Sequence, residues 1–162
     1  MESTFQIREI RSKDRSWIAE FAAQSWGSGI IISRRKRYDI VKLRGFVAIQ
    51  NHEYAGLITL AIEEDECQVI SLDAIIENIG IGTSLINQTI AYGRQHGCRR
   101  VWLITTNDNT PALRFYQTRG FRLKAIYPGE IEYSRELKPE IPLFGLDSIP
   151  IQDEIELEYI LK

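Results

Sequence analysis

The sequence has 162 residues, of which 44% are hydrophobic and 26% are charged, and we interpret residues 1–162 as one domain with a single buried core. The formal net charge of -2 argues against a dedicated nucleic-acid-binding protein, because such proteins normally carry a basic excess that neutralises phosphates. The sequence does not start with a secretion signal and contains no run of about 18 apolar residues, so we expect a soluble, cytoplasmic protein with no nucleic-acid or membrane partner.

In the first half of the chain, apolar and polar residues alternate over residues 5–10, which predicts a strand. Next, Ser12 or Asp14 can cap a helix whose apolar residues recur at helical spacing as far as Trp26. We expect a second, shorter helix over residues 34–43. Strands are then predicted over residues 45–49, 54–62 and 67–75, and the polar turns between them indicate hairpins.

The second half of the chain begins with a predicted helix over residues 83–96. The apolar, β-branched run 101–106 predicts a central strand that is covered on both faces. Pro111 fits the first turn of the next helix, which we expect over residues 112–119. The remaining predicted strands span residues 121–127, 130–137 and 154–161, with a proline-containing loop before the last of them.

Cysteine and histidine residues give no sign of a metal site. Cys67 and Cys98 lie far apart in the sequence and outside any metal-ligand spacing, which favours reduced, structural cysteines. His52 and His96 fall in a predicted turn and at a predicted helix end, without neighbouring ligands. We therefore expect no metal cofactor.

A glycine-containing turn, Asn-Ile-Gly-Ile-Gly-Thr over residues 78–83, joins a predicted strand to a predicted helix. Bare backbone N–H groups and the positive end of a helix meet in such a turn and can hold a phosphate. The same glycines could instead serve only a tight strand-to-helix connection. A dinucleotide-binding fingerprint is disfavoured because Leu85 stands in place of the third glycine, and a P-loop is excluded because no Gly-Lys-Ser/Thr follows.

A second group of residues follows the next strand. Asn109, Ala112 and Tyr116 are spaced by three and four positions, and therefore share one helix face. The pair formed by residues 77–82 and 109–121 resembles the two signature blocks of the GCN5-related N-acetyltransferases, and the order of the predicted elements also matches that family. Two departures are Glu77, where the family usually has Gln or Arg, and Asn78, where it often has Gly.

The resemblance implies an α/β fold with a mixed, mostly antiparallel twisted sheet of about seven strands, splayed between the fourth and fifth strands and flanked by about four helices. It also implies that acetyl-coenzyme A lies in the splay as co-substrate. In that arrangement the backbone of Leu72, Asp73 and Ala74 pairs with the pantetheine arm. The residues expected to hold the pyrophosphate are Ile79, Gly80, Ile81, Gly82, Thr83 and Ser84, and Asn109 and Ala112 line the far wall.

The chemistry of acetyl transfer needs a neutral amine and a proton for the leaving thiolate. The resemblance directs the Tyr116 hydroxyl at the thioester sulfur, and a phenol is protonated at neutral pH. Asp73 is our first candidate for the base that deprotonates the amine. Glu20, Glu63 and Glu132, or water without a dedicated base, remain open as alternatives. Three aromatic residues are candidate walls of the acceptor site, namely Trp26, Tyr38 and Tyr133.

Three functions are compatible with these patterns. The first is an N-acetyltransferase that acts by direct attack, in a ternary complex, on the amine of a small molecule or a peptide. The second is a catalytically inactive coenzyme-A-binding sensor or partner-binding module, favoured if the segment 134–150 blocks the acceptor groove. The third is a nicotinamide-dependent oxidoreductase. Edge strands near the C-terminal end could also support a homodimer.

Overall fold

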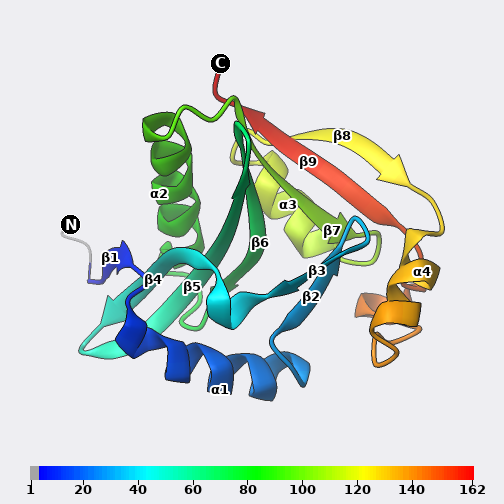
Figure 1. The fold of residues 1–162 in the computed structure, drawn as a ribbon, viewed down its shortest axis with the longest axis horizontal. Coiled ribbons are helices and arrows are strands. Elements are labelled where there is room, and N and C mark those ends of the chain that lie inside the picture. The colour runs from blue at the N-terminus through cyan, green and yellow to red at the C-terminus, as the bar shows by residue number, and fades with distance from the viewer. Residues whose placement is uncertain (1–3) are drawn as a thin grey trace.

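A computed structural model describes residues 4–162 of the chain (Figure 1). Residues 1–3, on which part of the N-terminal prediction rests, lie outside the described residues. The strands are β1 (Gln6–Glu9), β2 (Ile30–Ser33), β3 (Lys36–Asp39), β4 (Arg44–Gln50), β5 (Glu53–Glu63), β6 (Glu66–Ala74), β7 (Arg100–Thr106), β8 (Arg122–Tyr127) and β9 (Glu154–Ile160). The α-helices are α1 (Arg15–Trp26), α2 (Ile81–Gln95), α3 (Thr110–Gln117) and α4 (Glu130–Leu137).

Within residues 4–162, seven strands form one sheet in the order β1-β4-β5-β6-β7-β9-β8, while β2 and β3 pair separately as a hairpin. The central pair β6 and β7 is parallel, and the other neighbours in the sheet are antiparallel. Pairing of β6 with β7 runs only from Glu66↔Arg100 to Val69↔Leu103, although both strands continue beyond it. The sheet is therefore splayed between its fourth and fifth strands, which confirms the fold that the sequence predicted.

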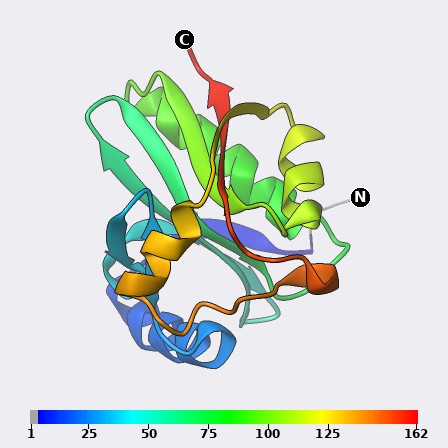
Figure 2. The ribbon, with the colours of Figure 1, turned by 90° about the vertical axis from the view of Figure 1, so that its right-hand side faces the viewer.

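Helices lie on both faces of the sheet (Figures 1 and 2), and a hydrophobic cluster lies under the helices of each face. The larger cluster contains Leu85 and Ile86 of α2 and Tyr116 of α3, so these helices cover one face. The smaller cluster contains Ile18 and Ala22 of α1, which cover the other face together with the β2–β3 hairpin. Between residues 4 and 162, no helix is both long and apolar enough to cross a membrane.

The β2–β3 hairpin corrects the prediction of a helix over residues 34–43. Arg34 and Arg35 form its tight turn with φ values of 48° and 64°, which are uncommon for non-glycine residues. Contacts distant in sequence hold this conformation, because the Arg34 backbone N–H donates to Glu154 Oε2 at 3.1 Å and Arg35 Nε donates to Glu130 Oε1 at 2.6 Å. The prediction of a helix rested on residues 34–43 alone, whereas the hairpin is stabilised by contacts with residues distant in the sequence. The prediction was therefore wrong.

Helix α4 corrects the prediction of a strand over residues 130–137. Gly129 precedes it with a φ of 73°, acidic residues occupy its first turn, and Arg135 lies in its last turn, where each charge suits the helix dipole. Its buried residues Glu130, Ile131 and Ser134 follow helical spacing. The prediction of a strand over residues 130–137 was therefore wrong.

The other predicted elements are confirmed with small shifts at their ends. Helix α1 ends where expected, since Gly27 adopts a left-handed conformation and its N–H donates to the Ala23 carbonyl. Cys67 and Cys98 are free and buried, in agreement with a structural role.

Candidate functional site

The splay leaves one edge of β6 without a neighbouring strand. Asp73 pairs with Leu57 on β5, and the Ile75 N–H donates to the Ala55 carbonyl at 2.9 Å. Because backbone groups of successive residues in a strand point to opposite sides, the N–H and C=O groups of Leu72 and Ala74 face the splay. This edge can accept an extended ligand as an added strand.

A β-bulge at Ile70 precedes this edge. Thr59 is paired with Ser71 and Leu60 with Val69, so Ile70 is the additional residue on β6. The bulge shifts the alternation of side chains beyond it. As a result Asp73 lies on the same face as its partner Leu57, toward α1 and the β2–β3 hairpin.

The glycine-containing turn after β6 is exposed and connects directly to α2. Asn78 and Gly80 have φ values of 64° and 89°, and Gly80 is the N-cap residue of the helix. The first intrahelical bond there is donated by the Ser84 N–H to the Gly80 carbonyl at 3.0 Å. The N–H groups of residues 81–83 precede that bond and have no intrahelical acceptor, which makes this helix end suited to an anion.

Helix α3 packs beside this turn. The Asn109 side chain accepts a hydrogen bond from the Ala112 N–H at 3.2 Å, so Asn109 caps the helix, and Ala112 packs against the larger cluster. A Cβ atom at Gly82 would lie 3.2 Å from the Phe115 ring. The lack of a side chain at this position therefore allows the two helices to approach closely.

Arg119 is a residue of the site that the sequence reasoning missed. Its Nε donates to Thr83 Oγ1 at 2.9 Å, and its guanidinium stacks over the Phe115 ring at 3.7 Å. It thus brings a positive charge to the first turn of α2, whereas the exposed Glu77 precedes that turn in the sequence. Arg119 lies within the second signature block, directly before Gly120, and this position in the sequence could have identified it as a residue of the site.

Asp73 on β6 and Tyr116 on α3 are close enough that, besides burial, the charge of Asp73 raises the pKa of the Tyr116 phenol. Burial raises the pKa of Asp73 to about 6, and its Oδ2 atom is buried without a hydrogen-bond partner in the described residues. Tyr116 is only 7% exposed, and its ring contacts Phe115 and Phe121. Burial and, secondarily, the charge of Asp73 raise the pKa of Tyr116 above its usual value. The pair thus combines a carboxylate that can accept a proton near neutral pH with a phenol that stays protonated.

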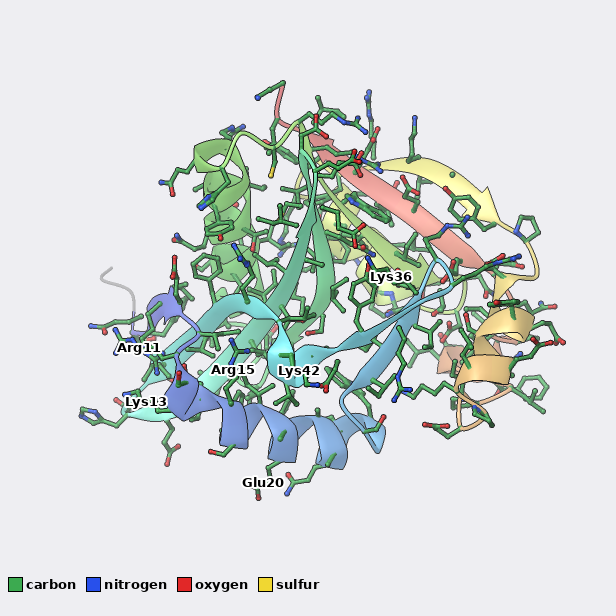
Figure 3. The ribbon with its side chains drawn as sticks, viewed as in Figure 1. Arg11, Lys13, Arg15, Glu20, Lys36 and Lys42 are labelled. Atoms are coloured by element: carbon green, nitrogen blue, oxygen red, sulfur yellow. The ribbon has the colours of Figure 1, made fainter. Side chains whose placement is uncertain are left out.

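The other carboxylates considered as bases lie on the surface. Glu20 is exposed on the outer side of α1 and points away from the sheet (Figure 3). Glu63 forms an ion pair with Lys36, and the Glu132 side chain is 84% exposed. Of the four candidates, Asp73 is the one that combines burial with a shifted pKa.

The three aromatic residues predicted for the acceptor site are not brought together. Tyr38 is buried and its hydroxyl donates to Gln68 Oε1 at 3.2 Å, so it anchors the hairpin to the sheet. Tyr133 lies on the outside of α4 under Arg35, with 4.4 Å between the guanidinium carbon and the ring centre. Trp26 alone of the three lines a cavity, which has a volume of about 460 Å³ and lies between α1, β2 and the segment 131–151.

Within residues 4–162, no three His, Cys, Asp or Glu side chains gather closely enough to hold a metal ion.

The chain is similar to known proteins in both sequence and structure. The family model described as "Acetyltransferase (GNAT) family" matches residues 7–121. The uncharacterised protein YxbD of Bacillus subtilis (strain 168) is 41% identical over 141 residues, covering 86% of this chain and 89% of YxbD.

Two solved structures share the fold. A GNAT family acetyltransferase from Elizabethkingia anophelis with acetyl-CoA bound has a TM-score of 0.71 at 18% identity, covering 99% of this chain and 100% of that one. Arabidopsis thaliana Naa50, in complex with a bisubstrate analogue, has a TM-score of 0.68 at 16% identity, covering 96% of this chain and 98% of that one.

Proposed function

Since this chain belongs to the acetyltransferase (GNAT) family, we propose that it transfers the acetyl group of acetyl-coenzyme A to a primary amine in a ternary complex. The observation that carries the proposal is the convergence of three features at the open end of the splay. These are the unpaired edge of β6, the helix end at residues 80–83, and the pair Asp73 and Tyr116.

The protein provides a binding group for each part of the coenzyme. The N–H and C=O groups of Leu72 and Ala74 pair with the amides of the pantetheine arm. The backbone of residues 79–84 holds the pyrophosphate, and Arg119 adds a positive charge that offsets the exposed Glu77. Asn109 and Ala112 line the opposite wall as part of α3.

The chain's own residues then supply the proton transfers. Asp73 accepts a proton from the incoming ammonium, and the neutral amine nitrogen attacks the thioester carbonyl carbon. A C–N bond forms and the C–S bond breaks as the tetrahedral intermediate collapses. Tyr116 donates its proton to the departing sulfur and regains one, through solvent, from the protonated nitrogen of the intermediate, which leaves as a neutral amide. Asp73 releases its proton to solvent before the next cycle. The register shift at Ile70 supports a further role, in which backbone N–H groups next to this bulge polarise the carbonyl.

The inactive coenzyme-binding module is the alternative, and it is favoured if the segment 134–150 blocks the acceptor groove. A cavity of about 460 Å³ stays open between this segment and α1, which supports the enzyme over the module. Asp73 has a buried carboxylate oxygen without a hydrogen-bond partner among the described residues, which lowers the stability of the folded protein. Retention of such a group likewise favours a catalytic role.

The coenzyme site is tested with the substitution Gly82→Trp. We expect it to weaken acetyl-coenzyme A binding by about tenfold or more, because the indole would fill the space beside the Phe115 ring and cover the helix end. Arg119→Met, which adds no bulk, is expected to weaken binding in the same direction. Binding is measured by calorimetry, and by thermal shift with acetyl-coenzyme A, coenzyme A, NAD and ATP.

Gln88→Trp is the matched control, because Gln88 is exposed on the same helix. It should bind the coenzyme as the wild type does, and the unliganded melting temperature of each variant reports whether it is folded. Stabilisation by NAD instead of acetyl-coenzyme A, or equal binding by Gly82→Trp and Gln88→Trp, would refute the assignment of this site.

A further inference from the structure

The cavity of about 460 Å³ has walls from four parts of the chain that are distant in sequence. They are the end of α1, strand β2, the end of β7 with Thr106, and the segment from α4 to Ile151. Figure 2 shows α4 and the segment after it lying across from α1 on the same side of the sheet. The volume falls in the range of about 300–1,000 Å³ that is typical of small-molecule sites.

The walls of this cavity are mainly apolar. The apolar lining residues are Trp26, Ile31, Ile32, Ile131, Ile141, Pro142 and Ile151. Among them, branched aliphatic side chains dominate, and these gain most from contact with an aliphatic or aromatic group of similar size.

The cavity adjoins the open end of the splay. Trp26 and Ile31 pack against the smaller hydrophobic cluster, which includes Leu57, and Leu57 is the cross-strand partner of Asp73. Thr106 is the last residue of β7, and the parallel strands β6 and β7 end on the same side of the sheet. An amine held near Asp73 can therefore extend its substituent into the cavity.

The outer wall is held in place by polar contacts. Arg135 Nη2 donates to the carbonyl oxygens of Pro142 and Ile151, at 2.8 and 2.7 Å. Asp108 Oδ2 accepts a hydrogen bond from the Leu146 N–H at 3.2 Å. Since these bonds fix the segment that follows α4, the cavity exists before an acceptor binds.

Lys138 gives the cavity a positive charge that no protein carboxylate neutralises. Its Nζ donates to the Ile30 carbonyl at 2.7 Å, and no Asp or Glu oxygen in the described part of the chain lies within 4.0 Å of it. The exposed Glu140 also lines the rim.

Three acidic residues near this face have basic partners, whereas Glu140 on the rim has no Lys or Arg nitrogen within 4.0 Å in the described part of the chain. Glu130 pairs with Arg35 at 2.6 Å, Glu154 with Arg34 at 3.2 Å, and Glu156 with Arg100 at 2.7 Å. A second cationic group on an acceptor would thus meet only the solvent-exposed Glu140 at the rim, whereas an anionic group meets the half-buried Lys138.

We propose that the acceptor is a free α-amino acid with a branched aliphatic or aromatic side chain. Its side chain fills the apolar cavity, its carboxylate binds Lys138, and its amino group lies toward Asp73. The inference rests on the proposed function and specifies the substrate class of the same site.

The test compares amino acids with their decarboxylated counterparts. Coenzyme A release is measured with L-leucine and L-phenylalanine, with 3-methylbutylamine and 2-phenylethylamine, and with the polycation spermidine. In Lys138→Met we expect kcat/KM for the amino acids to fall by about 10- to 100-fold, because a charge-assisted contact is lost, while that for the two amines without a carboxylate is unchanged. Lys138→Arg should retain most of the activity toward the amino acids.

Lys124→Met is the matched control, since Lys124 is exposed on β8, and it should behave as the wild type. As a second probe, Ile141→Trp should raise KM for leucine and phenylalanine without changing KM for acetyl-coenzyme A. The proposal is overturned if Lys138→Met affects both amine classes equally or neither, or if spermidine is the preferred acceptor. Those results would leave the proposed acetyl transfer intact. The proposed function itself would be refuted if the wild-type protein binds the coenzyme but acetylates no amine at all.

Discussion

Asp73→Asn is expected to make the protein more stable and far less active. Burial raises the pKa of Asp73 to about 6, above the usual value near 4, so the folded state binds the proton more tightly than the unfolded state. The stability of the wild type must then fall as the pH rises from about 4 to about 6, and stay at the lower value above it. The neutral amide introduced by Asp73→Asn removes this penalty.

Denaturant unfolding at several pH values measures the effect. We expect Asp73→Asn to exceed the wild type by about 1–2 kcal/mol at pH 7.5, after allowance for partial exposure, and to match it near pH 4. A variant that is destabilised at pH 7.5, or a difference that does not depend on pH, would contradict the burial of an ionised carboxylate.

The same substitution should reduce kcat/KM by about 10²- to 10⁴-fold, because the amine loses its proton acceptor. Activity of the wild type should increase with pH through a midpoint near 6, as Asp73 ionises, and this midpoint should disappear in Asp73→Asn. Glu63→Gln and Glu20→Gln serve as controls and should leave the rate nearly unchanged, since both carboxylates are exposed. A normal rate and pH profile in Asp73→Asn would assign proton removal to water.

Tyr116→Phe is expected to lower kcat by about 10²- to 10³-fold without changing the affinity for acetyl-coenzyme A. Phenylalanine keeps the ring contacts with Phe115 and Phe121, so the variant removes only the hydroxyl that protonates the leaving thiolate. Single-turnover kinetics and calorimetry separate these two quantities. Tyr133→Phe, on the outer side of α4, is the control.

A loss of coenzyme affinity equal to the loss of rate would mean that Tyr116 acts in binding. A rate like that of the wild type would exclude it as the acid.

The features that the sequence predicted are those carried by local signals. The helices predicted over residues 83–96 and 112–119 depend on residues within a few positions of each other, and both are present, with starts two residues earlier at Ile81 and Thr110. The splay also followed from the family resemblance of the two signature blocks.

The features that the sequence did not predict depend on contacts between distant residues. The β2–β3 hairpin is held by Glu130 and Glu154, which are far from Arg34 and Arg35 along the chain. Tyr38 was predicted to form a wall of the acceptor site, but the hairpin buries it against Gln68. The cavity walls at Trp26 and Ile141 meet only in the folded protein, so no sequence pattern could have joined them.

The most direct test of the central claim is acetyl transfer by purified protein, followed by mass spectrometry of the amine products. The protein is incubated with acetyl-coenzyme A and a mixture of amino acids, simple amines, polyamines and peptides. We expect at least one amine to gain an acetyl group together with stoichiometric release of coenzyme A, and we expect the double variant of Asp73→Asn and Tyr116→Phe to bind the coenzyme yet form almost no product. Tight coenzyme binding by the wild type without any acetylated amine would contradict the assignment as an acetyltransferase and leave a coenzyme-binding module.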